Sequence, residues 1–300
     1  MRNVRVDFAG DALEFIRQEM VKEGFPVDGI TDLSEGAFQF SRIQHRSIRP
    51  RPRETVFAAG VTVPTAHQAG FDALDKASKN GDSLKPFRSL DVARLNKNDG
   101  MLNDWGIHHF HIGTQAHPTA QGFVSRTGPV VYAKVTDDGL YVLAIDEHGR
   151  WSDKDLIEII HANWPALIAS YRVNVVPTQS MSSDDIKALR AANVNALVEL
   201  RDGTAYMSPG GGNLGSGDAV LARMSGIKFC KMIRGMETAF LERISAGDRT
   251  ASATHVDDRG QRTHELRMAW GSTGEGVDYE VVDLASGGTV VRLVGDRVDK

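Results

Sequence analysis

The order of apolar and polar positions along the chain predicts a series of short strands and helices. Residues 3–8 alternate apolar and polar side chains, as a short strand does, and residues 11–22 then repeat apolar side chains at helical spacing. A further helix is expected over residues 68–78, inside a polar stretch from 64 to 98 that is typical of a connector. The N-terminal part is therefore expected to be a mixed α/β unit.

The central segment carries the strongest pattern. Residues 107–112 can form a strand, and residues 130–135 and 140–146 are two apolar runs joined by the sequence TDDG. This is a hairpin signal, because Asp and Gly tolerate the positive φ of a tight turn. Ser152 is expected to cap a helix that ends before Pro165. The order of these elements predicts a small antiparallel sheet with a helix packed on it.

The C-terminal part combines helices with hairpins. A capped helix is expected in the sequence SMSSDDIKALRAAN, followed by a hairpin that turns at Asp202 and Gly203. A long amphipathic helix is expected from Asp218 to Ile244, with its glycines as candidate breaks. Strand-like runs separated by turns then occupy residues 250–300.

Together these elements predict an α+β fold in which small antiparallel sheets pack against helices. A chain of 300 residues is long enough for two or three such units. We expect an N-terminal α/β unit with a basic arm and a connector over residues 1–100, a central sheet and helix forming the candidate catalytic core over residues 101–176, and a C-terminal α+β unit over residues 177–300.

Composition narrows the functional classes. The formal net charge of −4 gives no global attraction to nucleic acid or membranes, so a local patch would have to supply it. Cys230 is the single cysteine, which excludes an internal disulfide framework and a multi-cysteine zinc site and fits a reducing compartment. No signal-peptide core is present, and no apolar run approaches the roughly 20 residues of a membrane span. We therefore expect a cytoplasmic protein without membrane contact.

The most unusual stretch is LNDWGIHHFHIG, which contains His108, His109 and His111. In a strand successive side chains point to opposite faces, so His109 and His111 share one face and His108 lies on the other. Two histidines on one face suit metal ligation or proton transfer near neutral pH. The alternative is structural, with His108 hydrogen-bonded in a core and the other two lining a polar surface.

Two further residues belong to the same candidate site. His148 follows the second strand of the central hairpin, and Arg126 precedes the first. A set made of His109, His111, Arg126 and His148 suits RNA cleavage without a metal or other cofactor. One imidazole would deprotonate the 2′-hydroxyl, another would protonate the leaving 5′-oxygen, and the arginine would stabilise charge on the phosphorane.

The segment SRTGPVVYAKVTDDGLYVLAIDEHG, residues 125–149, resembles the core of the RelE-type toxin ribonucleases. In that family an arginine-led hairpin has an acidic turn and ends in a loop that contains a histidine. The resemblance implies that Arg126 and His148 match positions of basic catalytic residues and that the sheet binds RNA across one face. The longer stretch from LNDWGIHHFHIG to IIHANWP also resembles a motif set of uncharacterised bacterial proteins.

A second candidate surface is the basic stretch RIQHRSIRPRPR, residues 42–53. Pro50 and Pro52 remove backbone donors and discourage a helix, so an extended arm is expected. Such an arm could contact the phosphates of a nucleic acid, or its side chains could simply be solvated or salt-bridged. The candidate nucleic-acid contacts are Arg42, Arg46, Arg49, Arg51 and Arg53.

The glycine-rich stretch PGGGNLGSG, residues 209–217, lies where a phosphate-binding loop would, between a strand and a helix. It lacks the spacing of a Walker or dinucleotide motif, and Asp218 would repel a phosphate, so a flexible turn is expected.

The first functional hypothesis is a metal-independent endoribonuclease or toxin-like effector that binds RNA and uses histidine acid/base chemistry. The second is a non-enzymatic regulatory or nucleic-acid-binding protein, and the third is a divalent-metal hydrolase that uses His109 and His111. An oligomer or a regulatory protein partner is compatible with each of them.

Overall fold

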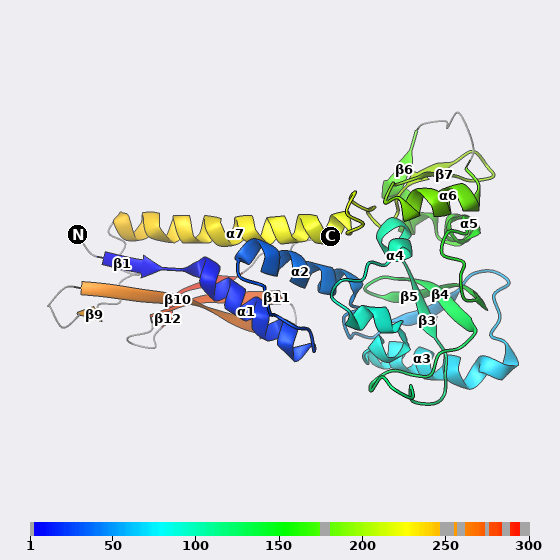
Figure 1. Cartoon of the computed structure of the whole chain (residues 1–300), viewed down its shortest axis with the longest axis horizontal. Helices are drawn as coiled ribbons and strands as arrows, with labels where there is room; N and C mark the ends of the chain where they lie inside the picture. Colours follow the sequence, from blue (N-terminus) through cyan, green and yellow to red (C-terminus); the bar gives the residue numbers. More distant parts are fainter. Residues whose placement is uncertain are drawn as a thin grey trace. The chain divides into compact units, whose positions relative to one another are not determined.

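The computed structural model describes residues 3–174, 181–246, 255–256, 262–273, 276–283 and 289–294 (Figure 1). Helices and mostly antiparallel sheets confirm the α+β class. The chain divides into two compact units, one made of residues 1–40 and 225–300 and the other of residues 41–224. This division differs from the expected three units. The first forty residues belong with the C-terminal part, and the expected connector, residues 64–98, belongs with the central sheet.

The first unit combines one sheet with helices from both ends of the chain. The sheet order is β1-β10-β11-β12, with β9 paired to β10, and β1 lies parallel to β10. Parallel pairing of strands so distant in sequence has no local signal. The strands are β1 (Asn3–Val6), β9 (His255–Val256), β10 (Arg262–Thr273), β11 (Gly276–Asp283) and β12 (Thr289–Val294).

Three helices contribute to this unit: α1 (Phe8–Lys22), the first part of α2 (Leu33–Arg46) and most of α7 (Val220–Ser245). The glycines of α7 do not break it. A Cβ atom at Gly226 would lie 3.2 Å from the backbone of Phe38, so the glycine lets α7 and α2 approach closely. Cys230 is buried in the same region, with its Sγ 3.7 Å from the carbonyl of Leu33.

The second unit is built on a four-stranded sheet with the order β2-β5-β4-β3. Strands β3, β4 and β5 are antiparallel, which confirms the central hairpin, and β2 runs parallel to β5. At the turn the Thr136 hydroxyl accepts a hydrogen bond from the backbone N–H of Gly139 at 3.0 Å. The strands are β2 (Glu54–Phe57), β3 (Ile107–His111), β4 (Pro129–Val135) and β5 (Gly139–Glu147).

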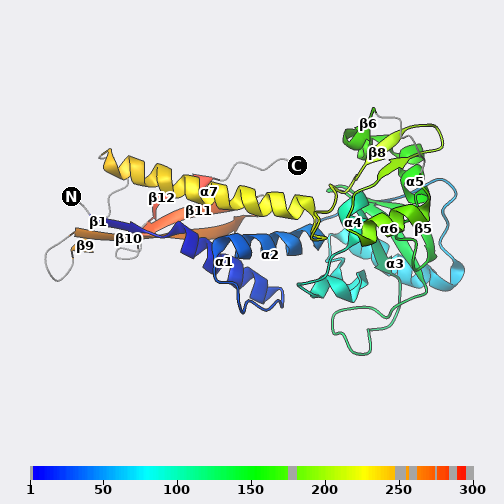
Figure 2. The ribbon, with the colours of Figure 1, turned by 45° about the horizontal axis from the view of Figure 1, so that its top comes forward.

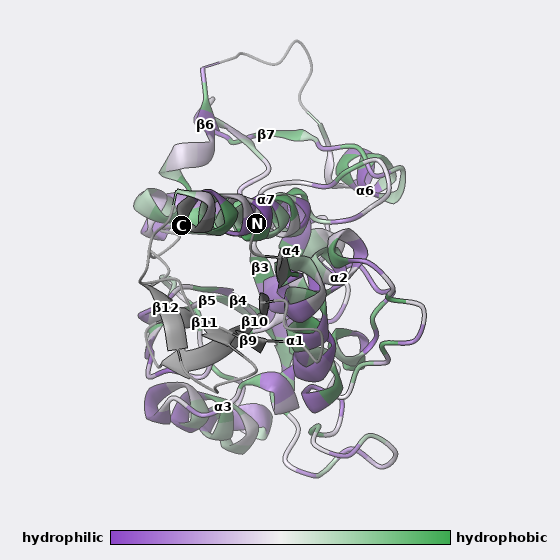
Figure 3. Ribbon diagram, turned by 90° about the vertical axis from the view of Figure 1, so that its left-hand side faces the viewer, coloured by the Kyte–Doolittle hydropathy of each residue, from purple (hydrophilic) through white to green (hydrophobic). Residues whose placement is uncertain are grey.

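Both faces of this sheet are covered. On one face Val131 and Val142 join a core with Phe71 of α3 (Gln68–Asn80), and on the other Tyr132 and Leu143 pack with α5 (Asp155–Asn163). Because both faces are buried, the middle strands carry apolar side chains at nearly every position. Helix α3 has polar and apolar sides, and Figure 3 shows both colours along it.

The helix α5 begins later than its sequence suggests. Lys154 occupies the N-cap position without a side-chain hydrogen bond, so the expected cap at Ser152 is wrong. Instead the side chain of Asp153 accepts a hydrogen bond from the backbone N–H of Asp155 at 3.0 Å. The end of the helix at Asn163 agrees with the break expected before Pro165.

A three-stranded sheet with the order β6-β8-β7 packs beside α5 and α6 (Figure 2). The hairpin across Asp202 and Gly203 is confirmed, and Ser182 with Asp185 forms the capping box of α6. These elements are α6 (Ser183–Ala191), β6 (Arg172–Val173), β7 (Leu197–Glu199) and β8 (Ala205–Met207).

The remaining described helices are short: α4 (Gly100–Trp105) and the 3-10 turns η1 (Thr65–His67), η2 (Lys85–Phe87), η3 (Leu90–Ala93), η4 (Pro165–Leu167) and η5 (Ala169–Tyr171). Within the described part of the chain, no helix has both the length and the apolar character needed to cross a membrane.

Candidate functional site

The three neighbouring histidines lie on strand β3, and the turn before this strand determines the residue at which it begins. Gly106, at a φ of 68°, ends α4 in the left-handed conformation that glycine adopts readily, and β3 starts at the next residue. His109 is the register partner of Tyr132 on β4, and the ring centroid of His109 lies 5.9 Å from that of His111. The two histidines share a face, as strand alternation predicts, whereas His108 contacts Phe110 of the other core.

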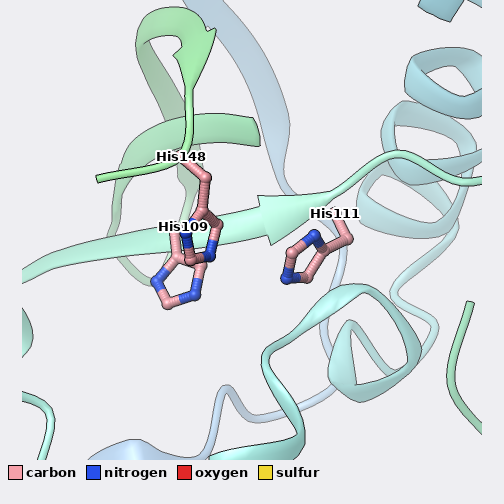
Figure 4. A group of neighbouring side chains, drawn as sticks. All are labelled: His109, His111 and His148. Carbon is pink, nitrogen blue, oxygen red and sulfur yellow. The ribbon is translucent and has the colours of Figure 1, made fainter. Parts of the chain in front are cut away.

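His148 joins this pair from the end of β5. Its backbone N–H donates to the carbonyl of Gly128 at 3.1 Å, which brings the loop beside the start of β4. The His148 ring centroid lies 5.7 Å from that of His109 and 5.6 Å from that of His111 (Figure 4). One nitrogen from each of the three rings lies within 4.8 Å of the others. Figure 4 shows the three side chains gathered at β3.

Arg126 completes the set of four residues expected from the sequence. Its Nη2 atom lies 3.5 Å from Nε2 of His148. Its charge is also among the causes that lower the pKa of His109 and of His111. Arg126 and His148 are exposed, while His109 and His111 retain 8% and 2% of their accessible surface. A ligand that approaches from solvent therefore meets Arg126 and His148 first.

Burial keeps these imidazoles neutral at pH 7. Desolvation, followed by the charge of Arg88, lowers the pKa of His109 well below its usual range. Desolvation and then the charge of Arg126 lower the pKa of His111 to about 4 and also lower the pKa of His148. The permanent charges that help to lower these three pKa values are those of Arg88 and Arg126. The potential at the site is therefore positive.

Thr127 sets the tautomer of His111. Its backbone N–H donates a hydrogen bond to Nδ1 of His111 at 3.4 Å, so the proton of the neutral ring belongs on Nε2. That Nε2 atom is buried and has no hydrogen-bond partner among the described residues, and the same is true of Nδ1 of His109. The cluster thus holds a hydrogen-bond donor that lacks an acceptor.

Trp151 is a neighbour that the sequence reasoning missed. Its ring centroid lies 4.7 Å from that of His109 and 4.5 Å from that of His148. The hydroxyl of Tyr132 fixes the intervening loop, because it donates to the backbone carbonyl of Glu147 and accepts from the backbone N–H of Arg150 at 3.1 Å. The position of Trp151 three residues after His148 was the available signal.

The basic stretch is not an extended arm over its whole length. Helix α2 continues to Arg46, so residues 42–46 are helical and the expectation is wrong there. Arg42, Arg46 and Arg53 are buried. Nε of Arg42 lies 3.2 Å from Asp218, and the guanidinium of Arg53 donates to the carbonyl of Thr136.

The guanidinium of Arg46 is hydrogen-bonded to backbone carbonyls of a loop that is distant in the sequence. Its Nη1 donates to the carbonyls of Asp91, Arg94 and Lys97, which holds this loop against α2. Of the five arginines, Arg49 and Arg51 are exposed, and Arg51 pairs with Asp137 at 2.9 Å. Three of the five expected nucleic-acid contacts are therefore buried and have partners within the protein.

The glycine-rich loop packs tightly on α4. The N–H groups of Gly210 and Gly212 donate to the carbonyls of Asp104 and Asn103 at 2.7 and 2.8 Å. These donors are therefore not free to bind a phosphate, and α7 begins at Val220, after the loop and Asp218.

Comparison of the chain with protein-family models, with curated proteins and with solved structures finds no match.

Proposed function

We propose that the unit formed by residues 41–224 is a metal-independent endoribonuclease whose site consists of His109, His111, Arg126 and His148. The supporting observation is the convergence of three imidazoles that burial keeps neutral and one guanidinium, with Arg88 and Arg126 as the permanent charges that help to lower the imidazole pKa values. A positive site with an unpaired donor suits the negative charge of a phosphodiester.

The proposed cleavage needs one imidazole that accepts a proton and one that donates a proton. One imidazole of the pair His109 and His148 takes the proton of the ribose 2′-hydroxyl as its oxygen attacks phosphorus. The other, in its protonated form, gives a proton to the 5′-oxygen as the phosphorus–oxygen bond breaks. The products are a 2′,3′-cyclic phosphate and a 5′-hydroxyl.

His111 and Arg126 serve the phosphate oxygens. Nε2 of His111 carries the proton because Nδ1 accepts from Thr127, and this buried donor, which has no acceptor among the described residues, would donate to a non-bridging oxygen that enters the site. Arg126 adds a permanent charge at the exposed side of the site. A bound phosphodiester also raises the pKa of nearby imidazoles, because opposite charge favours their protonated form. This supplies the protonated imidazole that the second proton transfer needs.

The experiment is single-turnover cleavage of a single-stranded RNA, with products identified by mass. We expect His109→Ala/His111→Ala and Arg126→Ala to abolish cleavage while thermal unfolding stays cooperative. A 2′-deoxy substitution at the cut site should block the reaction, and EDTA should leave it unchanged. His67→Asn, in the same unit, is the matched control. Cleavage that persists in the double variant contradicts the proposal.

A divalent-metal hydrolase is the second candidate, favoured by the three ring nitrogens that lie within 4.8 Å of one another. Against it, a metal-bound imidazole normally donates its other N–H to an acceptor, whereas Nδ1 of His111 faces the donor of Thr127. Elemental analysis of the purified protein separates the candidates. A stoichiometric metal that is lost in His109→Ala would favour the hydrolase.

A cytoplasmic location and RNA as the partner complete the proposal. The single, buried Cys230 accords with a reducing compartment.

A further inference from the structure

A second group of buried cations lies outside the histidine site, where the end of α2 meets the loop that carries η3. Arg46 is 6% exposed and Arg88 is 4% exposed, and Nη1 of Arg88 donates to the carbonyl of Arg46 at 3.2 Å. The guanidinium of Arg88 thus lies against the backbone of Arg46. Burial, with a smaller contribution from a neighbouring arginine, lowers the pKa of each to about 10.

Part of this charge has no acceptor within the described residues. Nη2 of Arg46, and Nε and Nη2 of Arg88, are buried without a hydrogen-bond partner. The carboxylate of Asp99 lies 3.9 Å from Nη2 of Arg88, which is beyond hydrogen-bond distance. Buried donors are almost always paired in folded proteins. An acceptor from outside the described residues is therefore expected beside the guanidinium of Arg46.

A small, half-open hollow lies beside Arg46, whereas Arg88 is not among its lining residues. Its polar lining residues are Arg42, His45, Arg46, Lys97, Asn98, Asp99 and Asn103, and Asp99 is the acid among them. The side-chain amide of Asn103 already donates to Asn213 and Gly217, so it is not counted as a donor to a ligand. Arg42 is neutralised by Asp218 at 3.2 Å, which leaves Arg46 and Lys97 against Asp99. The net charge of the hollow is therefore positive.

We propose that this hollow binds the oxyanion of a phosphate group. The enclosed part has room for a single oxygen, which would accept from Nη2 of Arg46. The other oxygens would lie at the mouth, where Lys97 and Asn98 are exposed. Free phosphate and a terminal phosphate ester present the same oxygens, and the proposal does not depend on the ribonuclease assignment.

The test is calorimetric titration of the full chain with sodium phosphate at pH 7, with sodium gluconate holding the ionic strength constant. We expect saturable binding that weakens about fivefold or more in Lys97→Gln, which removes an exposed charge at the mouth. Lys187→Gln, an exposed lysine of the same unit, should bind as the unchanged protein does. Adenosine 5′-monophosphate in place of phosphate tests the ester, with adenosine as its control.

Three results would overturn the proposal: no phosphate binding, equal affinities in Lys97→Gln and Lys187→Gln, or binding of adenosine as tight as that of its monophosphate. The first would mean that water fills the hollow, the second that phosphate binds elsewhere on the protein, and the third that the base is recognised instead of the phosphate. Arg46→Lys, which keeps the charge but removes Nη2, should abolish binding. Circular dichroism checks its fold, and if this variant does not fold the two lysine variants decide.

Discussion

Asp104 and Arg190 form a buried ion pair, with 2.7 Å between Oδ2 and Nη2 and side chains that are 3% and 10% exposed. The same guanidinium lies 4.3 Å from the ring of Trp105 and donates to the carbonyl of Trp151. Because Trp151 packs against His109 and His148, this pair connects α4 and α6 to the candidate site. Arg190 is thus a positioning residue for the histidines.

Asp104→Asn should therefore cost stability, because it leaves the charge of Arg190 buried without its partner. We expect a loss of about 3 kcal/mol in the free energy of unfolding, measured with urea. Asp155→Asn breaks the exposed pair with Arg201, whose side chains are 46% and 76% exposed, and should cost no more than about 1 kcal/mol. Equal costs for both variants would contradict the importance of the buried pair.

The tautomer of His111 predicts a difference between two glutamine variants. A glutamine amide can replace an Nε2–H donor, but it cannot transfer a proton. His111→Gln should therefore retain far more RNA cleavage than His111→Ala, which should lose about a hundredfold to a thousandfold in rate. His109→Gln should be as inactive as His109→Ala. Single-turnover rates of the four variants are the measurement, and equal losses for both His111 variants would exclude the donor role.

The buried histidines predict how stability depends on pH. The pKa values of His108 and His109 are lowered well below 6.5, and that of His111 to about 4, chiefly by burial. Below about pH 6.5 the unfolded chain binds more protons than the folded one, so acid favours unfolding. Stability should be full above that pH and fall toward pH 4, by up to about 1.4 kcal/mol per pH unit for each imidazole.

His108→Leu isolates one of these contributions. His108 is 7% exposed, its Nδ1 has no partner within the described residues, and its ring lies beside Phe110. The free energy of unfolding, measured with urea at pH 5, 6 and 7, should change less steeply with pH in this variant. The difference should correspond to the uptake of about one proton fewer on unfolding. His67→Asn should keep the original slope. A slope unchanged in His108→Leu would mean that His108 is protonated in the folded chain.

The sequence predicts the candidate site better than it predicts the surroundings. Strand alternation is enough to place His109 and His111 on one face, and the hairpin register pairs Pro129 with Glu147. Residues just outside a hairpin register are neighbours, which is why Arg126 and His148 meet. These relationships need only local pairing and short turns.

The misjudged features depend on contacts that have no local pattern. Arg46 donates to backbone carbonyls 45 to 51 residues away, and a carbonyl looks the same at every position of a sequence. From the sequence alone, a dense run of arginines therefore predicts a surface arm. In the same way, nothing near β1 indicates its parallel pairing with β10, so the expected domain division differs from the compact units.

The glycine-rich loop provides a last prediction, because its glycines are not equivalent. A Cβ atom at Gly210 would lie 2.3 Å from both the N of Gly106 and the carbonyl oxygen of Leu102, whereas one at Gly215 would meet nothing within 4 Å. Gly210→Ala must displace backbone at the turn into β3, so we expect a loss above about 2 kcal/mol in the free energy of unfolding and slower RNA cleavage. Gly215→Ala should stay within about 0.5 kcal/mol of the unchanged protein. Urea unfolding and cleavage rates of the two variants test whether the loop supports the histidine strand, and a silent Gly210→Ala would show that it does not.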